Sequence, residues 1–513
     1  MSKEQRQGLC AILERRGEPC AAQRGVLRAR VDAALWRALC EGLGQRHDLM
    51  GLWADAEEVH MALYEPHTRN FAIASLALEE HGYPSVGTFH AAAIRPERAI
   101  RDLLGIEPRG LPDERPWLDH DAWPLRHPLK DTPDEKSTEE EPRAYAFLPV
   151  EGEGLHEIPV GPVHADIIEP GHFRFTCAGE TVVRLEERLG YTHKGVERLM
   201  QGKTPQEAAR VAARICGDST VASSLAFARA VEAALEVSPP PRAVWLRALM
   251  AELERLANHL GDVGAVCNDA AFAFLHAHFG ILREDVLQAA DKCFGHRLMM
   301  DAIQPGGLAR DMAEQGSHVL GLLLDALDER LPKLIKIYDT TASLQDRTRN
   351  TGRLDPALAR SFAAGGFIGR ASGRAFDVRA NLPFAPYDEL SVTARVRGKG
   401  DVDARIWQRL DEIEQSMALL REILGKLPEG EVMTPLPDAP GEVREGLGLV
   451  EGFRGDVLVW LRLDAEGRVA RCHPRDPSWF QWPLLEAVIR DNIVADFPLC
   501  NKSFNCSYSG HDL

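Results

Sequence analysis

The sequence has 513 residues, of which 45% are hydrophobic and 27% are charged, a balance typical of globular proteins. It contains 60 Lys and Arg residues against 77 Asp and Glu residues, which gives a net charge of −17. Such acidity argues against a general nucleic-acid-binding surface and against direct binding to anionic lipid. Any attachment to a membrane is therefore expected to come through partner proteins.

No stretch approaches the roughly 20 consecutive apolar residues of a membrane-spanning helix. The charged segment 1–16 also lacks the apolar core of a signal peptide. We therefore expect a cytoplasmic protein without a membrane span of its own. The 10 cysteines follow no framework spacing, so we expect thiols or ligands rather than disulfides.

The clearest break in composition is the run Lys130 to Arg143, which is rich in acidic residues, contains two prolines and has almost no apolar residues. Such a run cannot bury a core and is typical of a solvated linker. We therefore predict one domain at residues 1–130, an acidic linker at 131–150 and a second domain at 151–513.

In the first domain, the pattern at 33–39 predicts a helix, whereas 59–63 and 71–78 suit either strands or helices. An α+β domain of about 130 residues fits a typical domain size. After the linker, residues 155–185 form a short mixed segment that precedes long helical patterns.

A capping box marks one helix start clearly, with an N-cap Thr204, a proline at the first position and Glu207 at the third. The helical pattern then continues from 208 to about 236, where three prolines at 239–241 end it. Further helices are predicted at 243–265, 280–300, 311–337 and 403–427. The segment 456–470 alternates between apolar and polar residues as the strands of a β-hairpin do, with Glu466 and Gly467 near the predicted turn. These patterns predict a mainly α fold with a β-containing periphery: an N-terminal α+β domain followed by a helical bundle.

Ordered motifs between Glu97 and Leu129 go beyond turn composition. They are Glu97-Arg98, Asp102-Leu103, Gly105-Ile106, Pro112, Arg115 and His127-Pro128-Leu129. This order resembles the signature of the small peripheral subunit of respiratory complex I, which packs beside the quinone-site subunit. A plain surface loop would explain the many Gly and Pro residues, but not the ordered match.

A second set of motifs extends over nearly all of residues 161–513. It comprises Gly161-Pro162-Val163-His164, the run from Glu169 to Phe175, the run from Gly190 to Glu197, the run from Glu252 to Leu260, the run from Phe294 to Asp301 and the run from Gly369 to Gly373. In this order they resemble the large subunit of energy-converting membrane-bound nickel–iron hydrogenases, a family homologous to the quinone-site subunit of complex I. Many motifs in one order are specific for a family, but less so for an activity.

The resemblance implies a nickel–iron centre held by four thiolates, which two C-x-x-C pairs supply in the family. Cys216 matches the first ligand, but Ser219 stands at the second ligand position. In the C-terminal pair, Ser507 and Gly510 take the two ligand positions. Because one thiolate of four is kept, we expect no intact nickel–iron centre and assign no cofactor to this chain, with Cys216 as the one retained metal-ligand candidate.

Two other interpretations of the cysteines stay open. Cys500 and Cys506 could join Cys216 and His511 in a site for another metal, although their spacing matches no common metal motif. Alternatively, the three cysteines are small buried apolar residues, a common environment for cysteine.

By the same resemblance, Glu169 matches the glutamate that passes protons in hydrogenases, and Arg454 matches the arginine that overhangs the metal site. Plain surface residues are the alternative for both. The family's quinone-binding His and Tyr positions hold Ile168 and Gly217 here, as in the energy-converting hydrogenases. Such a quinone pocket is therefore not expected.

The resemblance implies a large peripheral-arm subunit of a hydrogenase-like or complex I-like oxidoreductase complex that couples electron transfer to ion translocation. The expected partners are a small iron–sulfur subunit, which would carry the clusters, and membrane-embedded antiporter-like subunits that hold the complex on the inner face of the cell membrane. Alternatives are an active nickel–iron hydrogenase, an NADH/quinone oxidoreductase-type subunit or a structural scaffold. No dinucleotide-binding glycine motif follows a strand, so any NADH would bind a partner.

If the fold matches the family, the distant site segments must converge. We expect Cys216 to lie roughly 4–8 Å from the backbone at 506–510. We also expect Glu169 and Arg454 to line the same polar, water-holding cavity as a buried pair, because buried charges are tolerated only in hydrogen-bonded sets.

Overall fold

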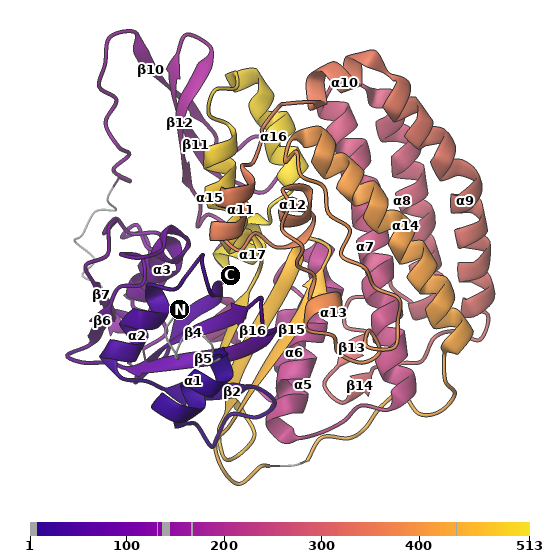
Figure 1. The fold of residues 1–513 in the computed structure, drawn as a ribbon. Coiled ribbons are helices and arrows are strands. Elements are labelled where there is room, and N and C mark those ends of the chain that lie inside the picture. Colours follow the sequence, from indigo (N-terminus) through magenta and orange to yellow (C-terminus); the bar gives the residue numbers. More distant parts are fainter. Residues whose placement is uncertain (1–7, 131, 136–143, 166–167, 438) are drawn as a thin grey trace.

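The computed structural model describes residues 8–130, 132–135, 144–165, 168–437 and 439–513. Much of the predicted acidic linker lies outside the described residues, so the domain boundary there stays a prediction. Figure 1 shows the N-terminal sheet on one side of the molecule and a bundle of long helices on the other. The chain is mainly α-helical with smaller sheets, as its patterns predict.

A five-stranded sheet with the order β1-β2-β5-β4-β3 forms the centre of the N-terminal part. The two segments that suited either strand or helix are antiparallel neighbours in it, with Met61 opposite Ala74. The strands are β1 (Glu18–Pro19), β2 (Leu27–Arg30), β3 (Asp48–Ala54), β4 (Glu58–Glu65) and β5 (Asn70–Ala77). The helices are α1 (Leu9–Arg16), α2 (Ala33–Cys40), η2 (Ala91–Ala93) and α3 (Ile94–Leu104). The predicted helix at 33–39 is thus confirmed.

Two carboxylates of α3, both from the first set of ordered motifs, tie the surrounding loops to the helix. Glu97 is fully buried and accepts hydrogen bonds from the backbone of Val86 and Gly87. Asp102 accepts from the backbone N–H groups of Trp117 and Leu118. The ordered motif around this helix therefore has a structural cause, since buried backbone groups need partners. Two short strand pairs lie nearby: β6 (Gly82–Pro84) with β7 (Glu107–Arg109), and β8 (Leu125–Arg126) with β9 (Asp134–Glu135).

The mixed segment after the linker forms a three-stranded antiparallel sheet that projects from the body in Figure 1. Its strands are β10 (Leu155–Val160), β11 (His172–Ala178) and β12 (Thr181–Arg188). Phe173 and Phe175 of β11 are buried against Phe497. This contact joins the sheet to the C-terminal segment of the chain.

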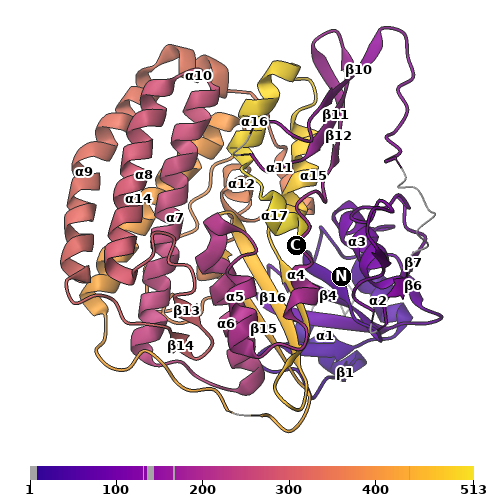
Figure 2. The ribbon, with the colours of Figure 1, turned by 180° about the vertical axis from the view of Figure 1, so that it is seen from behind.

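Four long helices lie side by side in the bundle, as both views show (Figures 1 and 2): α7 (Pro241–Asp269), α8 (Ala273–Phe294), α9 (Gly316–Thr340) and α14 (Val402–Lys426). Each of them confirms a predicted helix to within several residues. The remaining elements of this region are α4 (Val196–Met200), β13 (Ile303–Gln304), β14 (Gly307–Leu308), α10 (Ala342–Thr348), α11 (Pro356–Ser361), α12 (Gly366–Ala371) and α13 (Val378–Asn381). In the described ranges, none of the helices combines the length and apolar character needed to cross a membrane.

The helix predicted from 208 to 236 is wrong as one element. The structure has α5 (Pro205–Ala212) with the predicted capping box at Thr204, a short 3-10 turn η3 (Gly217–Ser219), and then α6 (Thr220–Leu235). The helical pattern continues across the break because Ala213 and Ile215 are buried as helix residues would be. Hydrogen bonds from other segments stabilise the interruption between α5 and α6. Local periodicity does not predict such tertiary contacts.

A third sheet, with the order β15-β16-β17, lies between α6 and the N-terminal sheet. The predicted hairpin is confirmed as β16 (Gly455–Leu463) and β17 (Val469–Arg475), and β15 (Arg444–Gly452) adds a strand that the pattern did not reveal. Trp460 packs on Trp53 of the N-terminal sheet, with ring centroids 5.7 Å apart. The two parts of the chain thus share a hydrophobic core.

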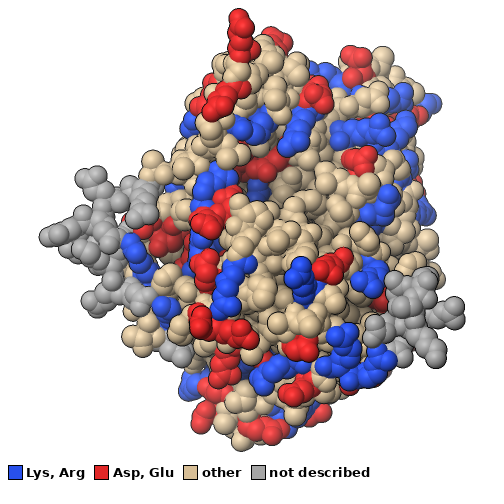
Figure 3. All heavy atoms as spheres, turned by 60° about the vertical axis from the view of Figure 1, so that its left-hand side comes forward, with Lys and Arg blue, Asp and Glu red and all other residues tan. Residues whose placement is uncertain are grey.

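The chain ends in a group of short helices beside this sheet: α15 (Ser478–Val488), η4 (Val494–Asp496), α16 (Phe497–Phe504) and α17 (Tyr508–Asp512). On the face drawn in Figure 3, acidic and basic side chains are interspersed over the surface. The negative net charge is therefore not gathered into one block on that face.

Glycines allow β15 to touch α6 directly, and this contact can be tested. A Cβ atom at Gly448 would lie 1.9 Å from the carbonyl oxygen of Ala226, a distance that forces the backbone to move. We predict that Gly448→Ala lowers the free energy of unfolding by about 1–3 kcal/mol, as overpacking does. Gly280→Ala is the control, because Gly280 lies in α8 with no atom within 4 Å of its added Cβ. Equal thermal unfolding midpoints for both variants would contradict the close packing.

Candidate functional site

The site begins at the break between α5 and α6. The Sγ of Cys216 donates a hydrogen bond to Asp218 Oδ1 over 2.9 Å. Asn258 of α7 donates to the carbonyl oxygen of Asp218 over 2.8 Å and fixes the turn to the bundle. Glu254, one helical turn earlier, accepts from the backbone of Val221 at the start of α6. The break is therefore held by side chains of α7.

The C-terminal segment returns to this break, as the resemblance predicts. Asn505 adopts a left-handed conformation with φ of 49°, which ends α16 and turns the chain. Ser507 then caps α17, accepting from the backbone N–H of Gly510 over 2.8 Å. Its own hydroxyl donates to Cys216 Sγ over 2.9 Å. The predicted approach of Cys216 to the segment 506–510 is confirmed.

Arg454, in the turn between β15 and β16, joins both segments. Its guanidinium donates twice to Asp218, over 2.7 and 2.6 Å, and once to Ser219 Oγ over 2.9 Å. Its Nε donates to the carbonyl oxygen of Asn505 over 2.6 Å. Arg454 is buried, with 4% of its surface exposed. A paired bidentate geometry of this kind is the strong form of a charge-assisted hydrogen bond.

Two further buried arginines hold the turn that carries Arg454. Arg255 of α7 donates to the last two carbonyl oxygens of β15 over 2.7 and 2.9 Å. Arg370 of α12 donates to Glu451 of the same strand and to Glu412 of α14, both over 2.8 Å. These contacts fix the turn against three helices, so Arg454 is placed by the bundle core rather than by its own loop.

The pKa values of the site follow from these contacts. Burial raises the pKa of Asp218, but the Arg454 guanidinium and the hydrogen bonds it receives outweigh burial and lower it to about 2. Burial and the Asp218 charge raise the pKa of the Cys216 thiol to about 12. Near neutral pH the site therefore holds a carboxylate, a guanidinium and an un-ionised thiol, which is a weak nucleophile and a weak metal ligand.

Glu169 lies at the edge of the site and is exposed. Its Oε2 accepts from the backbone N–H of Ser509 on α17 over 3.0 Å. The expected buried pair of Glu169 with Arg454 is wrong, because Arg454 takes Asp218 as its carboxylate partner instead. The expected water-holding cavity stays a prediction. His164 and His172 both bond to backbone carbonyl oxygens, which is a structural role.

The four positions of the family's thiolates carry groups that do not suit a nickel–iron centre. Ser219 and Ser507 supply hydroxyls that already bond to Arg454 and Cys216. Gly510 supplies no donor, and a Cβ there would lie 2.8 Å from the carboxylate of the buried Asp476. A soft metal pair needs bridging thiolates, and the side chains at these positions supply one protonated thiol. The residues do not fit the group.

The alternative metal site of Cys216, Cys500, Cys506 and His511 is also not assembled. Within the ranges that the structure describes, no group of three or more His, Cys, Asp or Glu side chains is arranged to hold a metal ion. His511 instead bonds to Asp512 and stacks on Trp479. Cys500 and Cys506 are buried, which agrees with the interpretation of small apolar residues.

Sequence reasoning missed two acidic residues of this site. Asp218 stands inside the degenerate C-x-x-C segment, so an acidic residue between the two ligand positions was the available signal. Asp476 follows β17 and lies far from every motif, so no pattern pointed to it. Both carboxylates face positions that thiolates occupy in the family.

Comparison with protein-family models gives three matches. Residues 33–138 match the respiratory-chain NADH dehydrogenase, 30 Kd subunit. Residues 194–261 match the nickel-dependent hydrogenase model, and residues 270–445 match the respiratory-chain NADH dehydrogenase, 49 Kd subunit. The segment with the Cys216 turn therefore falls in the hydrogenase match.

Similar proteins cover most of the chain. Formate hydrogenlyase subunit 5 of Escherichia coli (strain K12) is 32% identical over 84% of this chain and 77% of its own length. Hydrogenase-4 component G of the same organism is 32% identical over 84% and 76%. The membrane-bound hydrogenase subunit alpha of Pyrococcus furiosus is 27% identical over 68% and 85%. Each of these matches extends over most of both proteins.

The ionisation of Cys216 gives a direct test of the site's electrostatics. In Asp218→Asn, the negative charge that raises the thiol pKa is lost while Arg454 remains. We predict that the pH at which Cys216 is half-alkylated by iodoacetamide falls by at least about one unit, followed by peptide-resolved mass spectrometry. Asp301→Asn is the control, because Asp301 forms a similar bidentate pair with Arg214 at the exposed surface. An unchanged profile in Asp218→Asn would contradict the assigned contact.

Proposed function

We propose that this chain is the large subunit of an electron-transferring complex that works without a nickel–iron centre. The proposal starts from its family: the chain belongs to the family that includes the large subunits of membrane-bound hydrogenases, and it is related to the 49 Kd and 30 Kd subunits of respiratory-chain NADH dehydrogenase. The observation that carries this proposal is the set of side chains found at the family's four metal-ligand positions. A guanidinium–carboxylate pair, two hydroxyls and one protonated thiol stand at or beside the positions of four thiolates.

The hydrogen bonds of the site support the same proposal. By the resemblance, the matching arginine overhangs the metal site in the family, so the charge of Arg454 by itself does not exclude a metal. Here its guanidinium is paired with Asp218 and also donates to Ser219. A metal ion would have to displace these hydrogen bonds to reach the Ser219 hydroxyl.

We assign the redox chemistry to a partner. The relatives are named as subunits or components of larger enzymes, and one is named as membrane-bound. By analogy, a small iron–sulfur subunit would carry the clusters, and antiporter-like membrane subunits would anchor the complex at the inner face of the membrane. In this assembly the chain would couple electron transfer in the partner to ion translocation.

Glu169 is the residue that we propose for proton exchange at the site. It is exposed, so its carboxylate can exchange protons with water, and it contacts α17, which carries the C-terminal ligand position. An exposed carboxylate can accept and release protons. The competing function is a structural scaffold, in which Glu169 would only hold α17.

Metal content distinguishes the proposed complex from an active hydrogenase. We predict that the complex, purified anaerobically with its partners, contains far less than one nickel per copy of this chain by mass spectrometry. We also predict no hydrogen uptake with methyl viologen. Cys216→Ala is the matched variant and should leave the metal content unchanged. About one nickel per chain, lost in Cys216→Ala together with hydrogen uptake, would overturn the proposal.

Proton exchange at Glu169 distinguishes coupling from a scaffold role. We predict that Glu169→Gln slows proton movement at least about tenfold in liposomes that contain the complex. The movement is driven by electron transfer from reduced viologen to an added soluble iron–sulfur protein as the acceptor, and it is followed with a pH-sensitive dye. Gln keeps an acceptor for the Ser509 N–H, so the fold should persist. Glu157→Gln is the control, since Glu157 pairs with Arg174 on the surface of the β10–β12 sheet. A normal rate in Glu169→Gln would favour the scaffold.

A further inference from the structure

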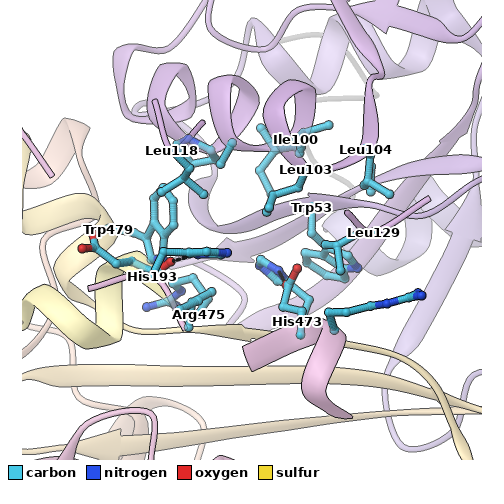
Figure 4. Close-up of a pocket in the computed structure, with 18 of the residues that line it drawn as sticks. Trp53, Ile100, Leu103, Leu104, Leu118, Leu129, His193, His473, Arg475 and Trp479 are labelled. Atoms are coloured by element: carbon cyan, nitrogen blue, oxygen red, sulfur yellow. Dashed lines mark hydrogen bonds and ion pairs between the residues drawn. The ribbon is translucent and has the colours of Figure 1, made fainter. Parts of the chain in front are cut away.

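An apolar cavity lies where the N-terminal part meets the C-terminal segment, apart from the Cys216 turn. Helix α3 contributes Ala99, Ile100 and Leu103 to one side, and the strand and helix around His473 and Trp479 form the other. Figure 4 shows Ile100, Leu103, Leu104 and Leu118 above His193, His473 and Arg475. The space open to the centre of a water molecule is about 70 Å³, several times the roughly 10–15 Å³ that one water needs.

Polar atoms of the cavity lining have no hydrogen-bond partner among the described residues. They are Nε1 of Trp479, Nε1 of Trp53, Nε2 of His473 and the Nε atoms of Arg471 and Arg475. Trp479 is 5% exposed and Trp53 is 1% exposed. Buried polar groups without partners are rare in folded proteins, because each costs about 1–3 kcal/mol. Five of them around one apolar cavity therefore indicate a bound molecule that supplies partners to some of them.

The protonation of these atoms defines what the molecule must offer. Both indole N–H groups are donors. Burial lowers the pKa of His473, so its ring is neutral near pH 7. Its Nδ1 bonds to Glu197 Oε1 over 2.7 Å and so carries the proton, which leaves Nε2 as an acceptor. With the Nε–H groups of Arg471 and Arg475, the lining thus offers four donors and one acceptor on an otherwise apolar wall.

The buried charged side chains of the lining each have an ion-pair partner. Glu197 pairs with Arg471 over 3.0 Å, and Arg475 pairs with Asp456. Asp512 accepts from Thr192 and from His511. A charged ligand would upset these pairs and leave an uncompensated buried charge, which is costly. The ligand is therefore expected to be neutral.

We infer that this cavity is a binding site for a small neutral molecule with an apolar, flat body and a carbonyl oxygen that accepts from an indole N–H. The rim includes the partly exposed Pro128 and the exposed Arg198, so the cavity opens to solvent at this side. The site joins α3 of the N-terminal part to α15 and α17 of the C-terminal part, so an occupant would bridge both parts. This inference does not depend on the absence of a metal centre.

Two molecules of nearly equal shape test the inference on the full-length chain. Acetophenone carries the carbonyl oxygen and ethylbenzene lacks it, and ligand-observed saturation-transfer NMR measures the affinity of each. We expect acetophenone to bind about fivefold more tightly, as one hydrogen bond of typical net strength gives. The double variant Trp479→Phe/Trp53→Phe keeps two apolar rings but removes both indole N–H groups, so it should abolish this preference and leave ethylbenzene binding unchanged.

Ala99→Phe fills the cavity and should abolish the binding of both molecules, whereas Trp407→Phe, on α14 away from the cavity, should change neither. If Ala99→Phe does not fold, the loss of preference in Trp479→Phe/Trp53→Phe decides the question. Equal affinity for the two molecules would show that water alone satisfies the indoles and would overturn the inference. Tighter binding of benzoate than of acetophenone, or no binding of acetophenone at its solubility limit, would overturn it as well.

Discussion

The guanidinium of Arg454 is the contact on which the site depends. It bonds to Asp218 and Ser219 near the start of the helical region and to Asn505 near the end of the chain, so segments almost 300 residues apart meet at one side chain. Because Arg454 is buried, its positive charge needs a neighbouring negative charge, and the Asp218 carboxylate supplies it. Side chains of the bundle position this pair through hydrogen bonds. Arg255 and Arg370 bond to the strand and turn that carry Arg454, and Asn258 bonds to the turn that carries Asp218.

This arrangement explains how the fold can persist without the family's four thiolates. Metal ligands from distant segments would cross-link the two ends of the large-subunit fold, and their loss would leave a polar gap in the core. Here the gap is filled by groups that satisfy one another: Ser507 donates to Cys216, Cys216 donates to Asp218, and Asp218 accepts from Arg454. Asp476 occupies the space beside Gly510, where a cysteine side chain would otherwise extend. A connected polar network of this kind can specify one packing of a core.

The parts of this picture that the sequence could predict are those that depend on local patterns or on ordered motifs. Helical periodicity placed α7, α8, α9 and α14, and the motif order predicted the meeting of Cys216 with the segment 506–510. Local patterns failed where tertiary contacts decide. The break between α5 and α6 carries buried apolar residues that fit a helix, and β15 is rich in glycine because α6 lies directly on it. The partner of Arg454 was also predicted wrongly, since Glu169 matched a family position while Asp218 matched none.

The central claim is that an ion pair, rather than a metal, connects the two ends of the site, and a double-mutant cycle of Arg454→Gln and Asp218→Asn tests it most directly. The free energy of unfolding of the wild type, both single variants and the double variant would be measured by denaturant titration, with and without a chelator. The account predicts a coupling of about 1–3 kcal/mol between the two residues that the chelator does not change. A coupling near zero, together with a loss of stability on chelation, would contradict it.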